Sequence, residues 1–217
     1  MYFDGSDVFV PGDVDAFALM PDGAILISLD SAATIPNFGA VDDSDIIRFT
    51  PTSTGATTAG TFAWYFDGSD VGLTTDGEDI DALSFALDGR LVISTRGSFS
   101  VTGVSGADED LIAFASTALG STTSGTWSWY FDGSDVGLNT SSSEDINGVW
   151  IEAVTNKIYL TTVGAFSVTG ASGDGADIFI CAPGTLGATT TCAFNMYWDG
   201  SAFGFAGEVA DGIAIVR

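Results

Sequence analysis

Histidine is absent from this chain, and basic residues are scarce. The 217 residues include no histidine and five lysines and arginines, against 29 aspartates and glutamates, for a formal net charge of −24 at pH 7. Without histidine, Ser-His-Asp catalysis, Cys-His catalysis and histidine-ligated metal sites are excluded in their usual forms. The negative charge repels nucleic acid and anionic membrane surfaces, but it admits divalent cations, cationic partners and neutral sugars. A surface that only keeps the protein soluble is the alternative interpretation.

Long apolar runs and cysteines are also lacking. No run of about 18 apolar residues occurs, so we expect no membrane insertion. The first residues show neither a basic nor an apolar leader segment, and the chain starts inside a repeat, which is typical of a mature or trimmed form. Two cysteines are too few for a cysteine-rich metal site.

The chain does contain a repeated stretch. The sequence Tyr-Phe-Asp-Gly-Ser-Asp-Val-Gly-Leu begins unchanged at Tyr65 and Tyr130, opens the chain in part at Tyr2, and returns altered at Tyr197. The spacings of 63, 65 and 67 residues predict a repeat architecture. We expect one repeat domain over 1–217. Its units lie at about 2–64, 65–129 and 130–196, with a partial unit at 197–217.

Each full unit contains four strand-like segments, with a Phe-Ser-Val-Thr-Gly loop or its equivalent between the second and third. The fourth segments alternate aromatic residues with a period of two, which places Trp127, Trp129 and Phe131 on one predicted face. The first segments are Asp13–Leu19, Asp79–Phe85, Asp145–Ile151 and the terminal Asp211–Val216. The remaining segments are Ala24–Leu29, Arg90–Thr95 and Lys157–Thr162, then Asp45–Thr50, Asp110–Ala115 and Asp177–Ala182, then Thr61–Phe66, Thr126–Phe131 and Ala193–Trp198.

Four strands per unit predict an all-β, β-propeller-like fold, with three full four-stranded blades and a partial fourth made from the two chain ends. The sequence has no second and third strands for that fourth blade. A trimmed chain, an incomplete blade, and strands supplied by another molecule are the three explanations. The last would allow self-association through the incomplete blade. A β-solenoid and a two-sheet sandwich are the alternative architectures.

The repeated motifs as a set resemble repeats of bacterial secreted or surface proteins. The set comprises the tyrosine stretch at Tyr65, Glu78–Leu83, Gly89–Thr95, Gly97–Gly103 and Asp108–Phe114, and the resemblance covers nearly the whole chain. No activity is assigned to that family, so the resemblance implies an extracellular or cell-surface location and no particular chemistry. It also implies that longer relatives supply the missing strands before the opening tyrosine.

The two cysteines are peculiar to the third unit. Cys181 stands where the other units have Phe49 and Phe114, and Cys192 stands where they have Gly60 and Gly125. They end the third strand and begin the fourth, so an antiparallel hairpin brings them together. We predict a disulfide between them, which implies an oxidising compartment. Two unrelated buried thiols are the alternative.

Acidic residues recur before the first strand, before the third strand and in the tyrosine stretch itself. Crowded carboxylates repel one another unless a cation neutralises them, and Ca²⁺ takes six to eight oxygen ligands. The positions that we predict as calcium ligands are Asp13, Asp15, Asp79, Asp81, Asp145, Asp43, Asp45, Asp108, Asp110 and Asp177. Capping of backbone N–H groups at strand entries is the alternative, and turn chemistry is the preferred interpretation of the acids in the tyrosine stretch.

The position of the first strand decides where some of these acids lie. If that strand is innermost, the equivalent positions Asp15, Asp81, Asn147 and Asp211 face a central channel as a ring, where a cation fits. Trp150 and Arg96 break the repeat symmetry. Packing inside the fold is the preferred role for Trp150, and sugar stacking on an exposed face is the alternative.

The acids are equivalent between units, whereas a catalytic pair breaks repeat symmetry. We therefore predict no enzyme, and instead a non-catalytic extracellular binding module for a protein or glycan, with Ca²⁺ as the cofactor that it admits. The first alternative is a structural subunit of an extracellular assembly completed by strand exchange. The second is a carboxylate-based glycan-active enzyme.

Overall fold

The computed structural model describes residues 2–215, and over these residues the fold is all-β, with short 3₁₀ turns and no α-helix. Each unit forms one four-stranded antiparallel sheet whose strands lie in sequence order. The first sheet contains β1 (Val14–Leu19), β2 (Ile25–Leu29), β5 (Ile46–Ser53) and β6 (Ala59–Phe66). The second contains β7 (Ala82–Phe85), β8 (Leu91–Ser94), β11 (Leu111–Ala118) and β12 (Ser124–Phe131). The third contains β13 (Gly148–Ile151), β14 (Ile158–Thr161), β17 (Ile178–Thr185) and β18 (Thr191–Trp198).

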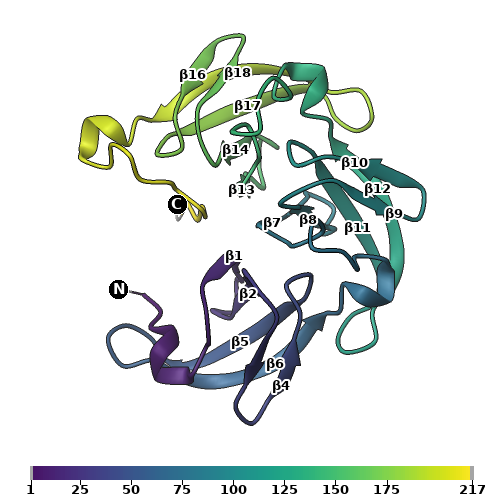
Figure 1. The fold of residues 1–217 in the computed structure, drawn as a ribbon, viewed down its shortest axis with the longest axis vertical. Helices are drawn as coiled ribbons and strands as arrows, with labels where there is room; N and C mark the ends of the chain where they lie inside the picture. The colour runs from purple at the N-terminus through teal and green to yellow at the C-terminus, as the bar shows by residue number, and fades with distance from the viewer. Residues whose placement is uncertain (1, 216–217) are drawn as a thin grey trace.

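The three sheets stand around a common centre, and both chain ends lie in the open sector between the first and third sheets (Figure 1). The first strand of each sheet is innermost, and β7 contacts both β1 and β13. Apolar side chains fill the two spaces between neighbouring sheets. The second sheet is therefore buried on both faces, as its apolar strands require.

A two-stranded hairpin follows the second strand of every sheet, where the sequence predicted a loop. The three hairpins are β3 (Ala33–Ile35) with β4 (Gly39–Val41), β9 (Phe99–Val101) with β10 (Val104–Gly106), and β15 (Phe166–Val168) with β16 (Ala171–Gly173). The loop prediction was wrong because each segment pairs with itself over only three residues, which is too short for a clear alternating pattern.

A β-bulge interrupts the fourth strand of each sheet at its tyrosine. Leu111 pairs with Phe131 while the next residue, Ile112, pairs with Trp129, which leaves Tyr130 as the extra residue. Phe131 consequently packs between the second and third sheets, whereas Trp127 and Trp129 pack between the first and second. The predicted common face for these three aromatic residues was wrong for Phe131, since the bulge shifts the alternation by one residue.

The predicted disulfide is confirmed between Cys181 and Cys192, whose Cα atoms are 5.2 Å apart. The other two sheets have a phenylalanine and a glycine in these places. A Cβ atom on Gly125 would lie 2.5 Å from the ring of Phe114, so only glycine leaves room for that ring. The disulfide therefore occupies the space that a ring fills in the other sheets.

The chain ends do not form strands in the described residues. Tyr2–Asp4 is irregular and leads into the 3₁₀ turn η1 (Gly5–Val8), and 211–215 is also irregular. Val216 lies outside the described residues. The strand expected at Asp211 is not formed in the described residues, where no ladder joins 211–215 to a neighbouring strand. The segment nevertheless reaches the centre, where Ile213 is buried.

Candidate functional site

The repeated tyrosine stretch ties each sheet to the next. The carbonyl of Tyr65 accepts a hydrogen bond from the N–H of Gly120 at 2.9 Å. The Asp70 carboxylate accepts from the N–H of Thr123 at 2.7 Å, and the Thr123 hydroxyl accepts from the N–H of Asp67 at 2.9 Å. We call these contacts the aspartate–threonine latch. They recur between Tyr2–Asp7 and the Gly55–Thr58 loop and between Tyr130–Asp135 and the Gly187–Thr190 loop.

Three of the predicted metal ligands hold backbone amides instead of facing a common point. Asp45, Asp110 and Asp177 occupy equivalent positions at the start of the third strand. In Asp110, one carboxylate oxygen accepts from the N–H of Ala107 and the other from the N–H of Gly133, both at 2.9 Å. Asp45 and Asp177 repeat this pattern. This geometry is that of a structural cap.

Asp43 and Asp108, also predicted as metal ligands, take part in the fold through their backbones. The Asp43 carbonyl accepts from the N–H of Ile80 at 3.2 Å, and the Asp108 carbonyl accepts from the N–H of Ile146 at 3.1 Å. Both residues thereby link one sheet to the entry of the next, and their side chains are half-buried.

The remaining predicted ligands gather at the centre. A cavity of about 320 Å³ lies at the start of the innermost strands. Its polar lining comprises Asp13, Asp15, Asp30, Asp81, Arg96, Asp145, Asn147 and Asp211. All four residues of the predicted ring, Asp15, Asp81, Asn147 and Asp211, line this one cavity. Asp79 lies beside it, with a carboxylate oxygen 3.8 Å from the Arg96 guanidinium.

Burial and mutual repulsion make this cavity unfavourable for negative charge. Burial raises the pKa of Asp81 well above its usual range, and the neighbouring Asp145 adds to the effect. Burial, followed by the charge of Asp108, raises the pKa of Asp145 to about 7. Burial, followed by the charges of Asp15 and Asp43, raises the pKa of Asp79 to about 8 despite the nearby Arg96. A positive charge would relieve all three carboxylates.

Three carboxylate oxygens at this centre lack a hydrogen-bond donor. They are Oδ1 of Asp79, Asp81 and Asp145, whose residues are only 1%, 4% and 7% exposed. Among the described residues, no three acidic or cysteine side chains converge closely enough to hold a metal ion directly. The acids thus surround a space instead of forming a tight cage.

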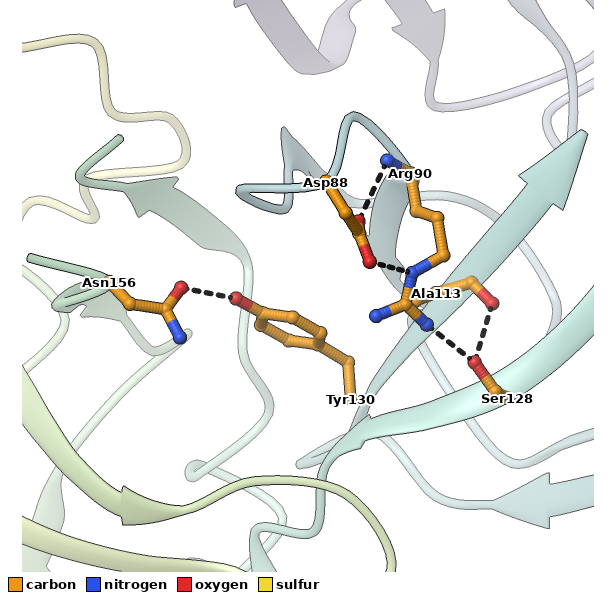
Figure 2. Close-up of polar contacts among 6 residues, drawn as sticks. All are labelled: Asp88, Arg90, Ala113, Ser128, Tyr130 and Asn156. Carbon is orange, nitrogen blue, oxygen red and sulfur yellow. Dashed lines mark hydrogen bonds and ion pairs between the residues drawn. The ribbon is translucent and has the colours of Figure 1, made fainter. Parts of the chain in front are cut away.

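A second polar site lies between the second and third sheets, around Arg90. Its guanidinium bonds Asp88 at 2.8 Å and the Ser128 hydroxyl at 2.8 Å, while the Tyr130 hydroxyl and the Asn156 side-chain oxygen are 2.9 Å apart (Figure 2). The polar residues that line a groove of about 230 Å³ here are Asp88, Arg90, Tyr130 and Asn156, together with the apolar Leu87, Trp129 and Leu186. We call this the Arg90 groove.

The Arg90 groove was not predicted, although a signal existed. The residue equivalent to Arg90 is Ala24 in the first unit, and Asn156 replaces a glycine in the turn before the second strand. Asn156 adopts a left-handed conformation with φ of 59°, which asparagine tolerates better than most residues. Departures from the repeat therefore mark this groove.

Two further hollows have mostly apolar linings. One, of about 340 Å³, lies at the opposite end of the innermost strands and includes Trp150, whose ring packs edge-on against Tyr159. Trp150 is half-buried, so it contributes to packing and also lines this hollow. The other, of about 650 Å³, faces the open sector and is lined by Phe3, Phe17 and Ile27 among others.

Within residues 2–215, no helix has the length and apolar character needed to cross a membrane. Comparison with protein-family models, with curated proteins and with solved structures gives no match to this chain.

Proposed function

We propose that this chain is a non-catalytic binding module of the extracellular space, built as a propeller with three full blades and a partial fourth. The central position of β1, β7 and β13 and the approach of 211–215 to them support the propeller architecture. The disulfide supports an oxidising compartment. The resemblance of the repeats to bacterial surface proteins agrees with both.

The observation that carries the binding role is the Arg90 groove. In a repeat protein, residues equivalent between units maintain the fold, and the latch aspartates and the strand caps behave in this way. Arg90 and Asn156 of the Arg90 groove instead differ from their equivalents in the other units. The groove combines fixed polar groups with apolar surface, which is the usual composition of a ligand site.

The chemistry of the groove favours a neutral saccharide. Asp88 and Asn156 offer acceptor and donor atoms, Arg90 offers donors, and sugar hydroxyls can both donate and accept. Leu87 and Trp129 supply the apolar surface on which the C–H face of a sugar ring packs. Since the chain carries a net charge of −24, an anionic glycan would be repelled.

The arrangement of the acids supports a non-catalytic role. Asp45, Asp110 and Asp177 accept hydrogen bonds from backbone N–H groups in the same way in each unit, as structural residues do. A glycosidase instead uses one pair of carboxyl groups that flanks the bond to be cleaved.

Saturation-transfer NMR with a panel of neutral mono- and disaccharides tests the proposal. We expect at least one saccharide to receive magnetisation from the wild-type protein and to lose it in the Arg90→Ala, Asn156→Ala double variant. Arg48→Ala is the matched control, since Arg48 forms a similar ion pair with Asp22 in the first unit. Transfer that persists in the double variant, or no transfer to any saccharide, would contradict the glycan role.

A structural subunit completed by strand exchange is the second candidate, favoured by the apolar hollow in the open sector. Phe17, Ile25 and Ile27 line this hollow, whereas the equivalent Leu83, Leu91 and Ile93 pack in the core between the first and second sheets. Ile25 and Ile27 are themselves buried, so Phe17 is the partly exposed one of the three. Light scattering separates the candidates, because a strict monomer at high concentration would exclude strand exchange between copies.

A further inference from the structure

We propose that the acidic cavity at the centre of the three sheets binds a divalent cation that retains part of its water shell. Asp15, Asp81, Asp145 and Asp211 surround the bound ion. This site is separate from the Arg90 groove and does not depend on a saccharide ligand.

The charge balance of the cavity favours a positive partner. Six aspartates line it, and within residues 2–215 Arg96 is the only basic residue that does so. The Arg96 side chain is 67% exposed, so solvent screens much of its charge. Like charges at this density disfavour the folded state unless protons or a cation neutralise them.

Buried carboxylate oxygens without a hydrogen-bond donor mark the place where a ligand would bind. Asp81 and Asp145 line the cavity, both are more than nine-tenths buried, and each has an Oδ1 atom without a donor. Leaving a buried charged oxygen unsatisfied costs more than leaving a neutral one unsatisfied. A water molecule held by a cation donates the missing hydrogen bond and brings the compensating charge as well.

The size of the cavity indicates a hydrated ion. Each water molecule takes about 30 Å³ of liquid, so a cavity of about 320 Å³ has room for an ion with its inner water shell. Since no three described acids converge on one point, direct coordination by a full protein cage is not available. Mg²⁺ commonly keeps several waters, and Ca²⁺ accepts irregular sets of oxygens, so both suit the site.

Comparison of the repeat units suggests a conservative substitution for the site, from aspartate to asparagine. Asn147 takes the place of an aspartate in the ring, and its side-chain oxygen accepts a hydrogen bond from the Thr161 hydroxyl at 3.0 Å. An amide is therefore compatible with the position that Asp81 occupies in the second unit. Asp81→Asn and Asp145→Asn remove charge at the centre without removing volume.

Thermal unfolding of the full chain at neutral pH provides the test. After EDTA treatment, MgCl₂ or CaCl₂ is added, and NaCl at equal ionic strength serves as the control for screening. At a hundredfold excess over the dissociation constant, the divalent salt should raise the melting temperature by roughly 5 to 10 °C beyond the NaCl control.

The Asp81→Asn, Asp145→Asn variant should lose this divalent increment, and its metal-free melting temperature should not fall. The charge-matched control Asp76→Asn, Glu208→Gln alters two exposed acids and should keep the increment. If the buried variant does not fold, Asp211→Asn changes an exposed member of the ring and should reduce the increment. An increment no larger than that of NaCl, or one retained in the folded ring variants, would overturn the proposal.

Discussion

Asp135 shows what one residue of the repeated stretch does. Its carboxylate accepts a hydrogen bond from the N–H of Thr190 at 2.8 Å and so joins the second sheet to the loop of the third. The fourth copy of the stretch has Ala202 in the equivalent place. The first three copies of the stretch each use this aspartate to bind the loop between the third and fourth strands of the sheet that follows. The fourth copy lacks the carboxylate that makes this contact.

Asp135→Ala should lower the free energy of unfolding by about 1 kcal/mol, because the backbone N–H of Thr190 then loses its acceptor at a partly exposed site. Urea denaturation measures the change. Asp76→Ala, at an exposed acid outside the latch, should leave the stability nearly unchanged. Equal effects of the two substitutions would show that the latch contributes nothing specific.

At the scale of elements, the hairpin of the third and fourth strands is filled in two ways. The third sheet has a disulfide there, and the other two sheets have a phenylalanine ring packed beside a glycine. Cys181 and Cys192 join β17 and β18, and the β11–β12 hairpin has Phe114 and Gly125 there. Cys181→Ala, Cys192→Ala should cost about 3 kcal/mol by the chain-entropy estimate.

Cys181→Phe, Cys192→Gly should recover part of that loss, since the ring fills the space next to the glycine as in the other two hairpins. Chemical denaturation under oxidising conditions compares the two double variants. If the phenylalanine–glycine variant is the less stable of the two, the equivalence of the hairpins is wrong.

The elements could be predicted from the sequence wherever the repeat and the side-chain period agree. All twelve strands of the three sheets appear close to the predicted ranges, and the comparison of units also gave the cysteine pair. The bulge at Tyr130 could not be predicted, because one extra residue leaves the aromatic pattern intact in the sequence. The hairpin β9–β10 was missed because its strands are too short to show a period.

The repeat also determined which residues of the candidate sites could be predicted from the sequence. Sequence spacing correctly placed Asp15, Asp81 and Asp211 around one centre, since their equivalence requires it once the first strand is innermost. Spacing alone could not distinguish these acids from caps such as Asp110, because the difference depends on whether a backbone N–H points at the carboxylate. The Arg90 groove needs contacts between two units, so in the sequence only the departures from the repeat at Arg90 and Asn156 mark it.

For the whole molecule, buried acids determine how stability depends on pH. Burial raises the pKa of Asp45 and Asp110 to about 6 against the lowering effect of their backbone donors. Burial and the neighbouring Asp108 raise that of Glu109 to about 7. The folded state therefore binds more protons than the unfolded state between about pH 4 and 7, and its stability falls as pH rises through this range.

In EDTA, the melting temperature should accordingly be higher at pH 5 than at pH 7.5. Differential scanning calorimetry across this range measures the trend. The Glu109→Gln variant should show a shallower decline, since one of the titrating groups is removed. A melting temperature that rises from pH 5 to pH 7.5 would show that these carboxyls are ionised more readily in the folded chain than their burial indicates.

The binding role of the whole molecule is tested most directly by mapping where a saccharide docks. The NMR signals to follow are the Arg90 Nε–H, the Asn156 side-chain amide and the Trp129 indole N–H, during titration with the saccharide that gives the strongest transfer. We predict that these signals shift together with one dissociation constant while the Arg48 signal stays fixed. Unshifted Arg90-groove signals, or shifts confined to the Trp150 hollow, would contradict the account.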